Sequence, residues 1–367
     1  MRAAGNRTLG FHSIRFINMK SRYDRQDAAV IQAYLSGIDL QDAAAVDGAT
    51  INAVGLPPTS NDALKPGEKG CFRAHANIWS EVVQKRLPPV LVIESDATWD
   101  VNLRPIVALL NKHFTDLLRN MAVRPLYGEH AADNETAPLA DDTGRSDAAD
   151  PWWQPVDHRA PPLQPPPYLA EADADDPWHS DYWDLLSFGH CFDLQKAPNR
   201  HIRYADPWVP AGKDYFGHQL GVERVVHQSG GTVCTTAYAV TQRGAAKLLL
   251  RMALDLDMPI DLIMQSMIAN GELTAYSTIP TVMAQWHYKP NLGMEYRGAN
   301  SDIQGTMVEA LSGDNAPTMD GWEEAKSSKS VWMSKPSHPD AAFSEMALKV
   351  AWERIFSNEK DISVELG

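Results

Sequence analysis

The chain has 367 residues, of which 44% are hydrophobic and 22% are charged, ordinary values for a folded protein with a sizeable core. Its formal net charge of −14 argues against nucleic acid or an anionic membrane surface as the main partner, because both repel an acidic protein. Three cysteines are too few for a disulfide scaffold. The longest apolar run, Leu87 to Ile93, is far shorter than the ~18 residues that a membrane span needs.

The first third of the chain alternates between strand and helix patterns. Residues 14–19 predict a strand, and after a polar turn a helix is expected up to about Ser36, with Gly37 as its stop. Its expected packing face is Val30, Ile31, Tyr34 and Leu35. A second helix is indicated by apolar residues at helical spacing, namely Phe72, Ala76, Trp79 and Val83.

The next elements are a buried strand and a long helix. Pro89 to Ile93 is continuously apolar, which is typical of a strand covered on both faces of a parallel sheet. It ends at Glu94-Ser95-Asp96, and a helix is expected over residues 103–121. Further strands are predicted at 183–189 and 232–240, and Thr241 should cap a helix that runs to Leu254. This alternation predicts an α/β fold with a mainly parallel central sheet.

Residues 128–180 differ in kind, because they are rich in Asp, Ala and Pro and have no strand or helix periodicity. We expect a loosely packed surface insertion in a domain that covers residues 1–305. Four aromatic residues are expected to dock locally or to stack on sugars, namely Trp152, Trp153, Trp178 and Tyr182. The remaining tail, 306–367, should hold one packing helix near residues 340–356.

Glu94 and Asp96 form the sharpest local feature. Ligands of open α/β sheets bind beyond the carboxyl ends of the strands, and two carboxylates at positions i and i+2 there can converge on one cation. Oxygen ligands suit Mg²⁺ or Mn²⁺. The alternative is that acidic residues merely end a strand, which is common.

Short segments in a fixed order point to a known family. They are Ile17-Asn18-Met19-Lys20-Ser21-Arg22-Tyr23-Asp24-Arg25, Ala45-Val46-Asp47-Gly48, Gly67-Glu68-Lys69-Gly70-Cys71-Phe72-Arg73-Ala74-His75, Glu94-Ser95-Asp96, Trp183-Asp184-Leu185-Leu186, Thr236-Ala237-Tyr238 with Gly244-Ala245, Pro259-Ile260-Asp261 and Asn300-Ser301-Asp302-Ile303. Together they resemble glycosyltransferase family 25, the lipopolysaccharide-biosynthesis and collagen-galactosyltransferase-like enzymes, and its fungal-type members most. Two departures are Ser95, where the family has a middle Asp, and Ala74, where it has Ser.

The resemblance implies a GT-A-like, Rossmann-like fold that binds a nucleotide sugar. It also implies inverting transfer of a hexose, galactose being the commonest, from a UDP-sugar to a hydroxyl of a glycan or glycoconjugate. Mn²⁺ (or Mg²⁺) would neutralise the leaving diphosphate. Asp261 is the candidate base that deprotonates the acceptor, since it follows the third strand and precedes a helical run. The alternative role for Asp261 is a helix N-cap.

The expected donor-binding residues come from the same segments. Arg suits phosphate geometry, and Asp47 can hydrogen-bond ribose or base. The full set is Ile17, Asn18, Arg22, Arg25, Asp47 and His75. The alternatives are purely structural: a solvated turn for the arginines, a simple turn for Asp47 and a core position for His75. His287 is expected to complete the metal shell with Glu94 and Asp96, and Asp302 competes for that role.

Two other function classes remain open. One is a catalytically inactive glycan- or nucleotide-sugar-binding relative, which Ser95 and the long insertion make plausible; the other is a nucleotidyltransferase, which the lack of a G-x-x-x-x-G-K-[ST] loop disfavours. The resemblance implies the lumen of the secretory pathway (Golgi or ER), although residues 1–10 hold no signal-peptide pattern, and we expect a missing N-terminal anchor. In that compartment Cys191 and Cys234 are expected to be close and oxidised.

Overall fold

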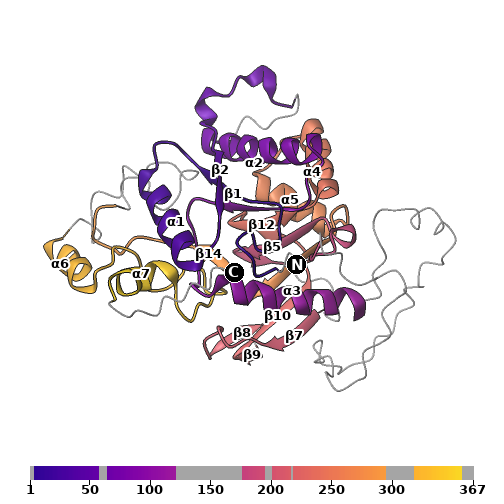
Figure 1. The fold of residues 1–367 in the computed structure, drawn as a ribbon. Helices are drawn as coiled ribbons and strands as arrows, with labels where there is room; N and C mark the ends of the chain where they lie inside the picture. Colours follow the sequence, from indigo (N-terminus) through magenta and orange to yellow (C-terminus); the bar gives the residue numbers. More distant parts are fainter. Residues whose placement is uncertain are drawn as a thin grey trace.

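The computed structural model describes residues 4–57, 64–120, 176–194, 201–215, 218–294 and 318–357, and its centre is an eight-stranded sheet (Figure 1). In spatial order the strands are β2 (Leu40–Ala44), β1 (Ile14–Asn18), β3 (Val90–Glu94), β12 (Ala237–Val240), β5 (Leu185–Gly189), β13 (Ala275–Ile279), β10 (Glu223–Gln228) and β7 (His201–Ala205). β12 and β10 run antiparallel to their neighbours, and the other six strands share one direction. This confirms the predicted α/β fold with a mainly parallel sheet, consistent with a Rossmann-like GT-A fold.

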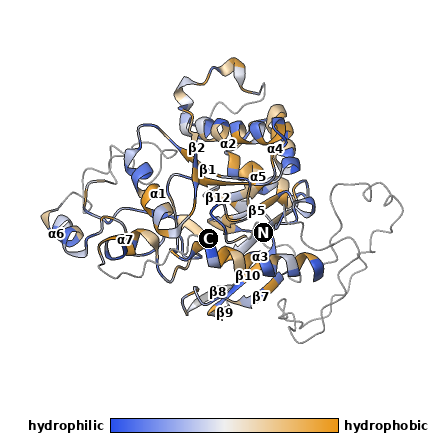
Figure 2. Cartoon of the chain, viewed as in Figure 1, coloured by the Kyte–Doolittle hydropathy of each residue, from blue (hydrophilic) through white to orange (hydrophobic). Residues whose placement is uncertain are grey.

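Helices cover both faces of the sheet, and β3 shows how the sequence divides between them. Val90 and Val92 pack into the core under α2 (Pro66–Gln84), α4 (Gln242–Leu254) and α5 (Ile260–Ala269). Leu91 and Ile93 face the opposite core, which contains α3 (Leu103–Asn120). Side chains alternate along a strand, so a continuously apolar run is what a strand between two helical layers requires. Figure 1 shows α2 and α3 on opposite sides of the sheet, and in Figure 2 both mix hydrophobic and hydrophilic residues.

Smaller elements surround the sheet. They are α1 (Tyr23–Ser36), α6 (Met319–Ser328), α7 (Ala347–Phe356), the short helices η1 (Gly48–Thr50), η2 (Ala53–Gly55) and η4 (Ser180–Tyr182), and the two-stranded pairs β4 (Ala97–Trp99) with β14 (Met283–Gln285), β6 (Phe192–Asp193) with β11 (Thr232–Val233), and β8 (Lys213–Tyr215) with β9 (His218–Gly221). None of the helices in the described ranges is long and apolar enough to span a bilayer.

The packing face predicted for α1 is wrong. Val30 and Tyr34 are 54% and 68% exposed, whereas the opposite, more polar side of the helix is buried. Gln32 donates to the carbonyl of Ala97 at 3.2 Å, and Ser36 accepts from Trp99 Nε1 at 2.9 Å. Polar side chains can be buried here because each finds a hydrogen-bond partner on β4 or beside it. Apolar periodicity alone does not carry that information.

Two further boundaries differ from the prediction. The run 232–240 is not one strand: β11 and β12 are separated at residues 234–236, where Cys234 has a positive φ of 69°. The C-terminal helix begins at Ala347 rather than near residue 340. By contrast, Thr241 caps α4 as predicted, since its side chain accepts from the backbone of Gly244 at 3.1 Å.

Residues 121–175, including Trp152 and Trp153, lie outside the described residues, so the expected insertion is judged only at its C-terminal end. Trp178 is completely buried there. Its ring stacks on Phe11 with centroids 4.9 Å apart, and its Nε1 donates to the carbonyl of Leu9 at 2.9 Å. Trp178 therefore docks locally, which was one of the two roles expected for it.

Candidate active site

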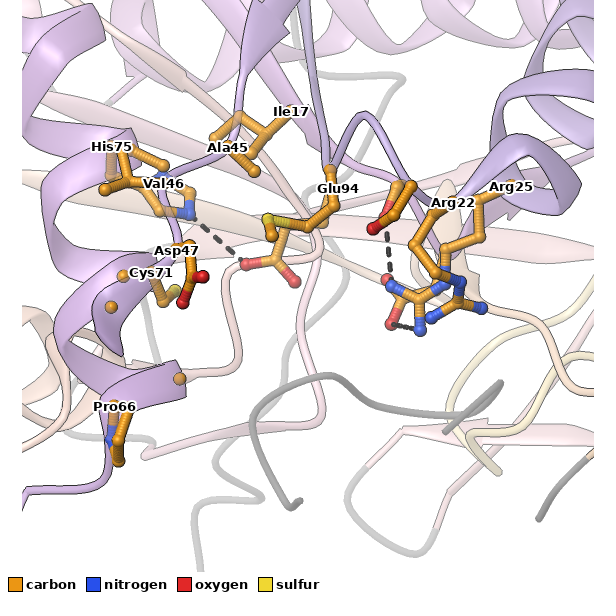
Figure 3. A pocket seen from close by; sticks show the side chains of 18 of the residues that line it. Ile17, Arg22, Arg25, Ala45, Val46, Asp47, Pro66, Cys71, His75 and Glu94 are labelled. Atoms are coloured by element: carbon orange, nitrogen blue, oxygen red, sulfur yellow. Dashed lines mark hydrogen bonds and ion pairs between the residues drawn. The ribbon is translucent and has the colours of Figure 1, made fainter. Parts of the chain in front are cut away.

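A pocket of about 520 Å³ opens where β1, β2 and β3 end. Its walls come from the β1–α1 turn, the loop after β2, the N-terminal half of α2 and the turn after β3. Figure 3 shows Glu94 in the middle, with Cys71 and His75 to one side and Arg22 and Arg25 to the other. Position at the carboxyl ends of parallel strands is the usual place for a ligand in an open α/β sheet.

Glu94 reaches the pocket because it continues the side of β3 that holds Val90 and Val92, the side under α2. Its Oε1 accepts a hydrogen bond from the Thr235 hydroxyl at 2.5 Å and lies 3.3 Å from Nε2 of His75. Burial raises the pKa of Glu94, but the hydrogen bonds and charge of His75, with Thr235 and Arg25, outweigh it and hold the pKa below its usual value. Within the described part of the chain no hydrogen bond reaches Oε2, so that oxygen is left for a ligand.

His75 lies at the end of a buried hydrogen-bonded chain. It is 1% exposed, and its Nδ1 is 2.8 Å from the hydroxyl of Tyr238, which accepts from Nε1 of Trp79 at 3.0 Å. Because Trp79 occupies a lone pair of that oxygen, the Tyr238 proton is free to point at Nδ1. In its neutral form the imidazole would then carry its hydrogen on Nε2, and that N–H would donate a hydrogen bond to Glu94.

The turn after β3 joins the acidic and basic walls of the pocket. Arg25 is 4% exposed; its Nη1 donates to the Ser95 hydroxyl at 2.9 Å, and its Nη2 lies 3.9 Å from Asp96 Oδ2. Gln285 also donates to Asp96, at 3.4 Å. Ser95, which departs from the family pattern, is therefore an acceptor for a buried arginine.

Arg22 stands at the entrance of α1 and is held by a local ion pair. Its Nε and Nη2 each lie 2.9 Å from a carboxylate oxygen of Asp24, and the Tyr288 hydroxyl donates to Asp24 at 2.9 Å. Burial raises the pKa of Asp24, but these hydrogen bonds and the charge of Arg22 lower it to about 2. The fork geometry leaves Arg22 oriented along one wall of the pocket.

The loop after β2 and the start of α2 touch through glycines. A Cβ on Gly48 would lie 1.6 Å from the carbonyl oxygen of Pro66, and a Cβ on Gly70 would lie 2.3 Å from that of Val46. No larger residue fits at either position without moving backbone. Asp47 lies between these contacts and accepts from the backbone of Ala49 at 3.0 Å, so it caps η1 as well as lining the pocket.

Asp261 lies in the first turn of α5, whose N-cap is Pro259, so the N-cap alternative for Asp261 is wrong. Its two oxygens accept from the backbone N–H groups of Cys234 at 3.2 Å and Leu262 at 3.0 Å. Asp261 is not among the residues that line the pocket. Its charge nevertheless acts on Cys71, as do those of Glu94 and Asp96.

Cys71 and His75 are four residues apart on α2 and face Glu94, and one ligand atom from each lies within 4.8 Å of the others. The pKa of Cys71 is raised by burial and by the surrounding carboxylates, Glu94 first. A sulfur, nitrogen and oxygen set favours Zn²⁺, whereas Mn²⁺ and Mg²⁺ favour oxygen ligands. For those two ions the carboxylates of Glu94 and Asp96, both in the pocket wall, are chemically suitable donors.

Most of the site residues expected from the sequence meet in this pocket: Ile17, Arg22, Arg25, Asp47, His75, Glu94 and Asp96. Asn18 is instead turned to α1, where its amide donates to Gln26 at 3.1 Å. His287 follows β14 outside the pocket lining, and burial together with the charge of Arg25 lowers its pKa. Asp302 lies outside the described residues.

Sequence reasoning missed the contribution of Thr235. The only sequence feature that pointed to Thr235 was its position directly before the segment Thr236-Ala237-Tyr238, in a run that was interpreted as a continuous strand. It also missed that Cys71 faces the same carboxylate as His75, which their i, i+4 spacing predicts.

The sequence model of glycosyltransferase family 25 (LPS biosynthesis protein) matches residues 11–133, the stretch that supplies most of the pocket. Over these residues, about a third of the 367, the chain is similar to glycosyltransferase family 25. Similar proteins include procollagen galactosyltransferase 2 of Mus musculus, 35% identical over 104 residues, which are 25% of this chain and 17% of that protein. Procollagen galactosyltransferase 1 of Danio rerio is 34% identical over 105 residues, again 25% and 17%.

A third family 25 relative is the inactive glycosyltransferase 25 family member 3 of Homo sapiens, 32% identical over 108 residues, which are 26% of this chain and 18% of that protein. The matched stretch thus covers less than a fifth of each of these relatives. The similarity to the family model therefore covers strands and turns around the pocket, and that model match ends before Asp261.

Proposed function

We propose that this chain is a metal-dependent, inverting glycosyltransferase that moves a hexose, galactose first, from a UDP-sugar to a hydroxyl of a glycan or glycoconjugate. One observation carries the proposal: the family 25 segments converge on one pocket that has carboxylates in its centre and two arginines along one side. Procollagen galactosyltransferases among the relatives support galactose as the sugar to test first.

In this proposal Glu94 and Asp96 hold Mn²⁺ or Mg²⁺, with His287 as a further ligand. The cation, when bound, neutralises charge on the leaving diphosphate. Arg22 and Arg25 orient the diphosphate, since a guanidinium matches phosphate oxygens. Asp47 hydrogen-bonds the ribose or the base.

Asp261 acts as the base in this scheme. It takes the proton from the acceptor hydroxyl while that oxygen attacks the anomeric carbon, and the bond to the UDP oxygen breaks on the opposite face. Inversion requires one displacement and no covalent intermediate, by the logic of inverting hydrolases. The domain covers residues 1–305 in this proposal, with 306–367 as a tail.

The decisive experiment is a panel of UDP-sugars, each incubated with Mn²⁺ and a collection of sugar and glycopeptide acceptors, with released UDP and glycosylated product both measured. We expect turnover with one donor and its loss under a chelator. Binding of UDP without turnover for any donor would favour the second candidate, an inactive nucleotide-sugar-binding relative. That candidate is supported by Ser95 in the acidic turn and by inactive proteins among the relatives.

A further inference from the structure

We propose that the turn at residues 234–236 is a disulfide-anchored clip that fixes the distance between the carboxylates of Glu94 and Asp261. Cys234 and Thr235 are then positioning residues for the reaction. This inference rests on the proposed function, because it assigns a shared purpose to the metal-binding and the acceptor-activating carboxylate.

Two consecutive residues of the clip serve two different carboxylates. The backbone N–H of Cys234 donates to Oδ2 of Asp261 at 3.2 Å, and the hydroxyl of Thr235 donates to Oε1 of Glu94 at 2.5 Å. The carbonyl of Thr236 then accepts from the N–H of Glu94 at 2.9 Å. Glu94 ends β3 and Asp261 lies in the first turn of α5, so these carboxylates belong to separate elements and the clip bridges them.

The clip is fastened to the β6–β11 pair on its N-terminal side. A disulfide joins Cys234 to Cys191, with their Cα atoms 5.5 Å apart, as the sequence predicted for an oxidising compartment. The N–H of Cys191 also donates to the carbonyl of Val233 at 2.9 Å. The disulfide holds Cys234 itself, and the hydrogen bond holds the carbonyl of Val233, which belongs to the same peptide unit as the Cys234 N–H that contacts Asp261.

The chain that enters β11 is fixed as well. Oδ1 of the buried Asp193 accepts from the hydroxyl of Ser229 at 2.8 Å and from the N–H groups of Gly230 and Gly231 at 3.2 Å. A carboxylate with several donors of this kind locks a loop in one conformation. The clip is thus supported before the turn by Asp193 and at the turn by Cys191.

The backbone of Cys234 adds a separate argument. Its φ of 69° lies in the left-handed region, which is disfavoured for any residue with a Cβ. Such a conformation persists only where the surroundings impose it, and it occurs most often at functional sites. Here it separates β11, which pairs with β6, from β12, which pairs with β3, and it turns the Cys234 N–H toward α5.

The Thr235 half of the clip is tested with two variants that differ in one hydroxyl. Thr235→Val keeps the shape and removes the donor to Glu94, while Thr235→Ser keeps the donor. We expect Thr235→Val to weaken Mn²⁺ binding to the UDP-bound protein by about 10–100-fold in calorimetric titration, the usual effect of losing a partner of a metal ligand. Thr235→Ser should bind within ~3-fold of wild type. Equal Mn²⁺ affinity for both variants and wild type would overturn this half.

The disulfide half is tested on the wild-type protein and on a Cys191→Ser/Cys234→Ser double variant. A phosphine reductant supplies two electrons and turns the disulfide into two thiols. We expect kcat to fall on the order of 10–100-fold on reduction, as displacement of a reacting group does, with KM for the UDP-sugar little changed. The double variant should have the low kcat from the start and should not respond to the reductant.

Circular dichroism at the assay temperature separates a moved carboxylate from unfolding, and the Thr235 pair leaves the disulfide intact. If reduced wild type keeps its kcat while three free thiols are counted, the disulfide half is wrong. If the wild-type chain transfers no sugar from any donor, the proposed function fails. The Mn²⁺–UDP titrations still decide the Thr235 half in that case.

Discussion

His75 joins Tyr238 to Glu94: its Nδ1 lies 2.8 Å from the Tyr238 hydroxyl, and its Nε2 lies 3.3 Å from Glu94 Oε1. Tyr238→Phe removes the hydroxyl, which leaves two buried nitrogens, Nδ1 of His75 and Nε1 of Trp79, without that partner. We expect a loss of about 1–3 kcal/mol in the free energy of unfolding, measured by urea denaturation. Nitrogen NMR of the imidazole should also show a changed balance of the two tautomers.

Tyr204→Phe is the matched control for that variant. Tyr204 is as buried as Tyr238, each 3% exposed, but its hydroxyl makes no hydrogen bond to any described residue. Removing it should therefore leave stability unchanged within about 0.5 kcal/mol or raise it slightly. Equal losses for both variants would contradict the proposed chain from Tyr238 to Glu94.

Asp96→Asn tests the metal proposal. The amide keeps the size of the side chain but removes a charged ligand, so we expect transfer to be abolished and Mn²⁺ binding to the UDP complex to weaken strongly. Product formation and calorimetric titration give the two readouts. The control Asp39→Asn changes an exposed aspartate paired with Arg7, and it should keep both sugar transfer and Mn²⁺ binding. Near-normal turnover of Asp96→Asn in metal-free buffer would eliminate the proposal.

Asp261→Asn tests the base. The amide oxygen can still accept from the N–H of Cys234, so donor binding should persist, while turnover should fall by ~10²–10⁴-fold because the proton acceptor is gone. Steady-state kinetics with varied UDP-sugar separate kcat from KM. Asp257→Asn changes a nearby aspartate that pairs with Arg251 on the surface, and we expect wild-type rates from it. A small kcat effect at Asp261 would assign it a structural role only.

Gly70→Ala tests the contact between the loop after β2 and α2. The new Cβ would lie 2.3 Å from a backbone oxygen of Val46, and backbone cannot yield as a flexible side chain can. We expect a loss on the order of 1–3 kcal/mol in stability, measured by denaturation, and weaker UDP binding. Gly55→Ala meets nothing within 4 Å and should be neutral or slightly stabilising. Similar stability of both variants would show that the loop shifts freely.

The carboxyl group of Asp24 makes the stability of the folded chain depend on pH at the acid end. Its pKa is about 2 in the folded chain, below the value expected for an unfolded aspartate, so its contribution is complete above pH ~4 and is lost as the pH falls toward 2. Since the side chain is 27% exposed, we expect this carboxylate to contribute on the order of 1–2 kcal/mol to the free energy of unfolding. This contribution is measured by denaturing wild type and Asp24→Asn at pH values from 5 to 2. The plots of unfolding free energy against pH should converge at low pH. Plots that stay parallel would contradict the prediction.

The sequence predicted the features that follow from strand and helix periodicity and from local motifs. Pro89 to Ile93 and the carboxylates that follow it gave both the central strand and the centre of the pocket. Features that depend on a distant partner were not predictable in this way. Gln32 is buried because Ala97, 65 residues away, offers an acceptor, and the strand pattern at 232–240 hides the left-handed turn that the Cys191 disulfide supports.

The burial of Trp178 has a consequence for engineering the chain. Asn111 and Phe114 of α3 contact the segment at Pro177 and Trp178, and α3 ends at Asn120, roughly 14 Å further along the same helix by its rise per residue. The described chain therefore leaves α3 at Asn120, and where it is described again, at Pro177 and Trp178, it contacts the same helix. A connection engineered between Asn120 and Asp176 therefore has to span that length along α3, whatever its sequence, to keep the contacts of Pro177 and Trp178.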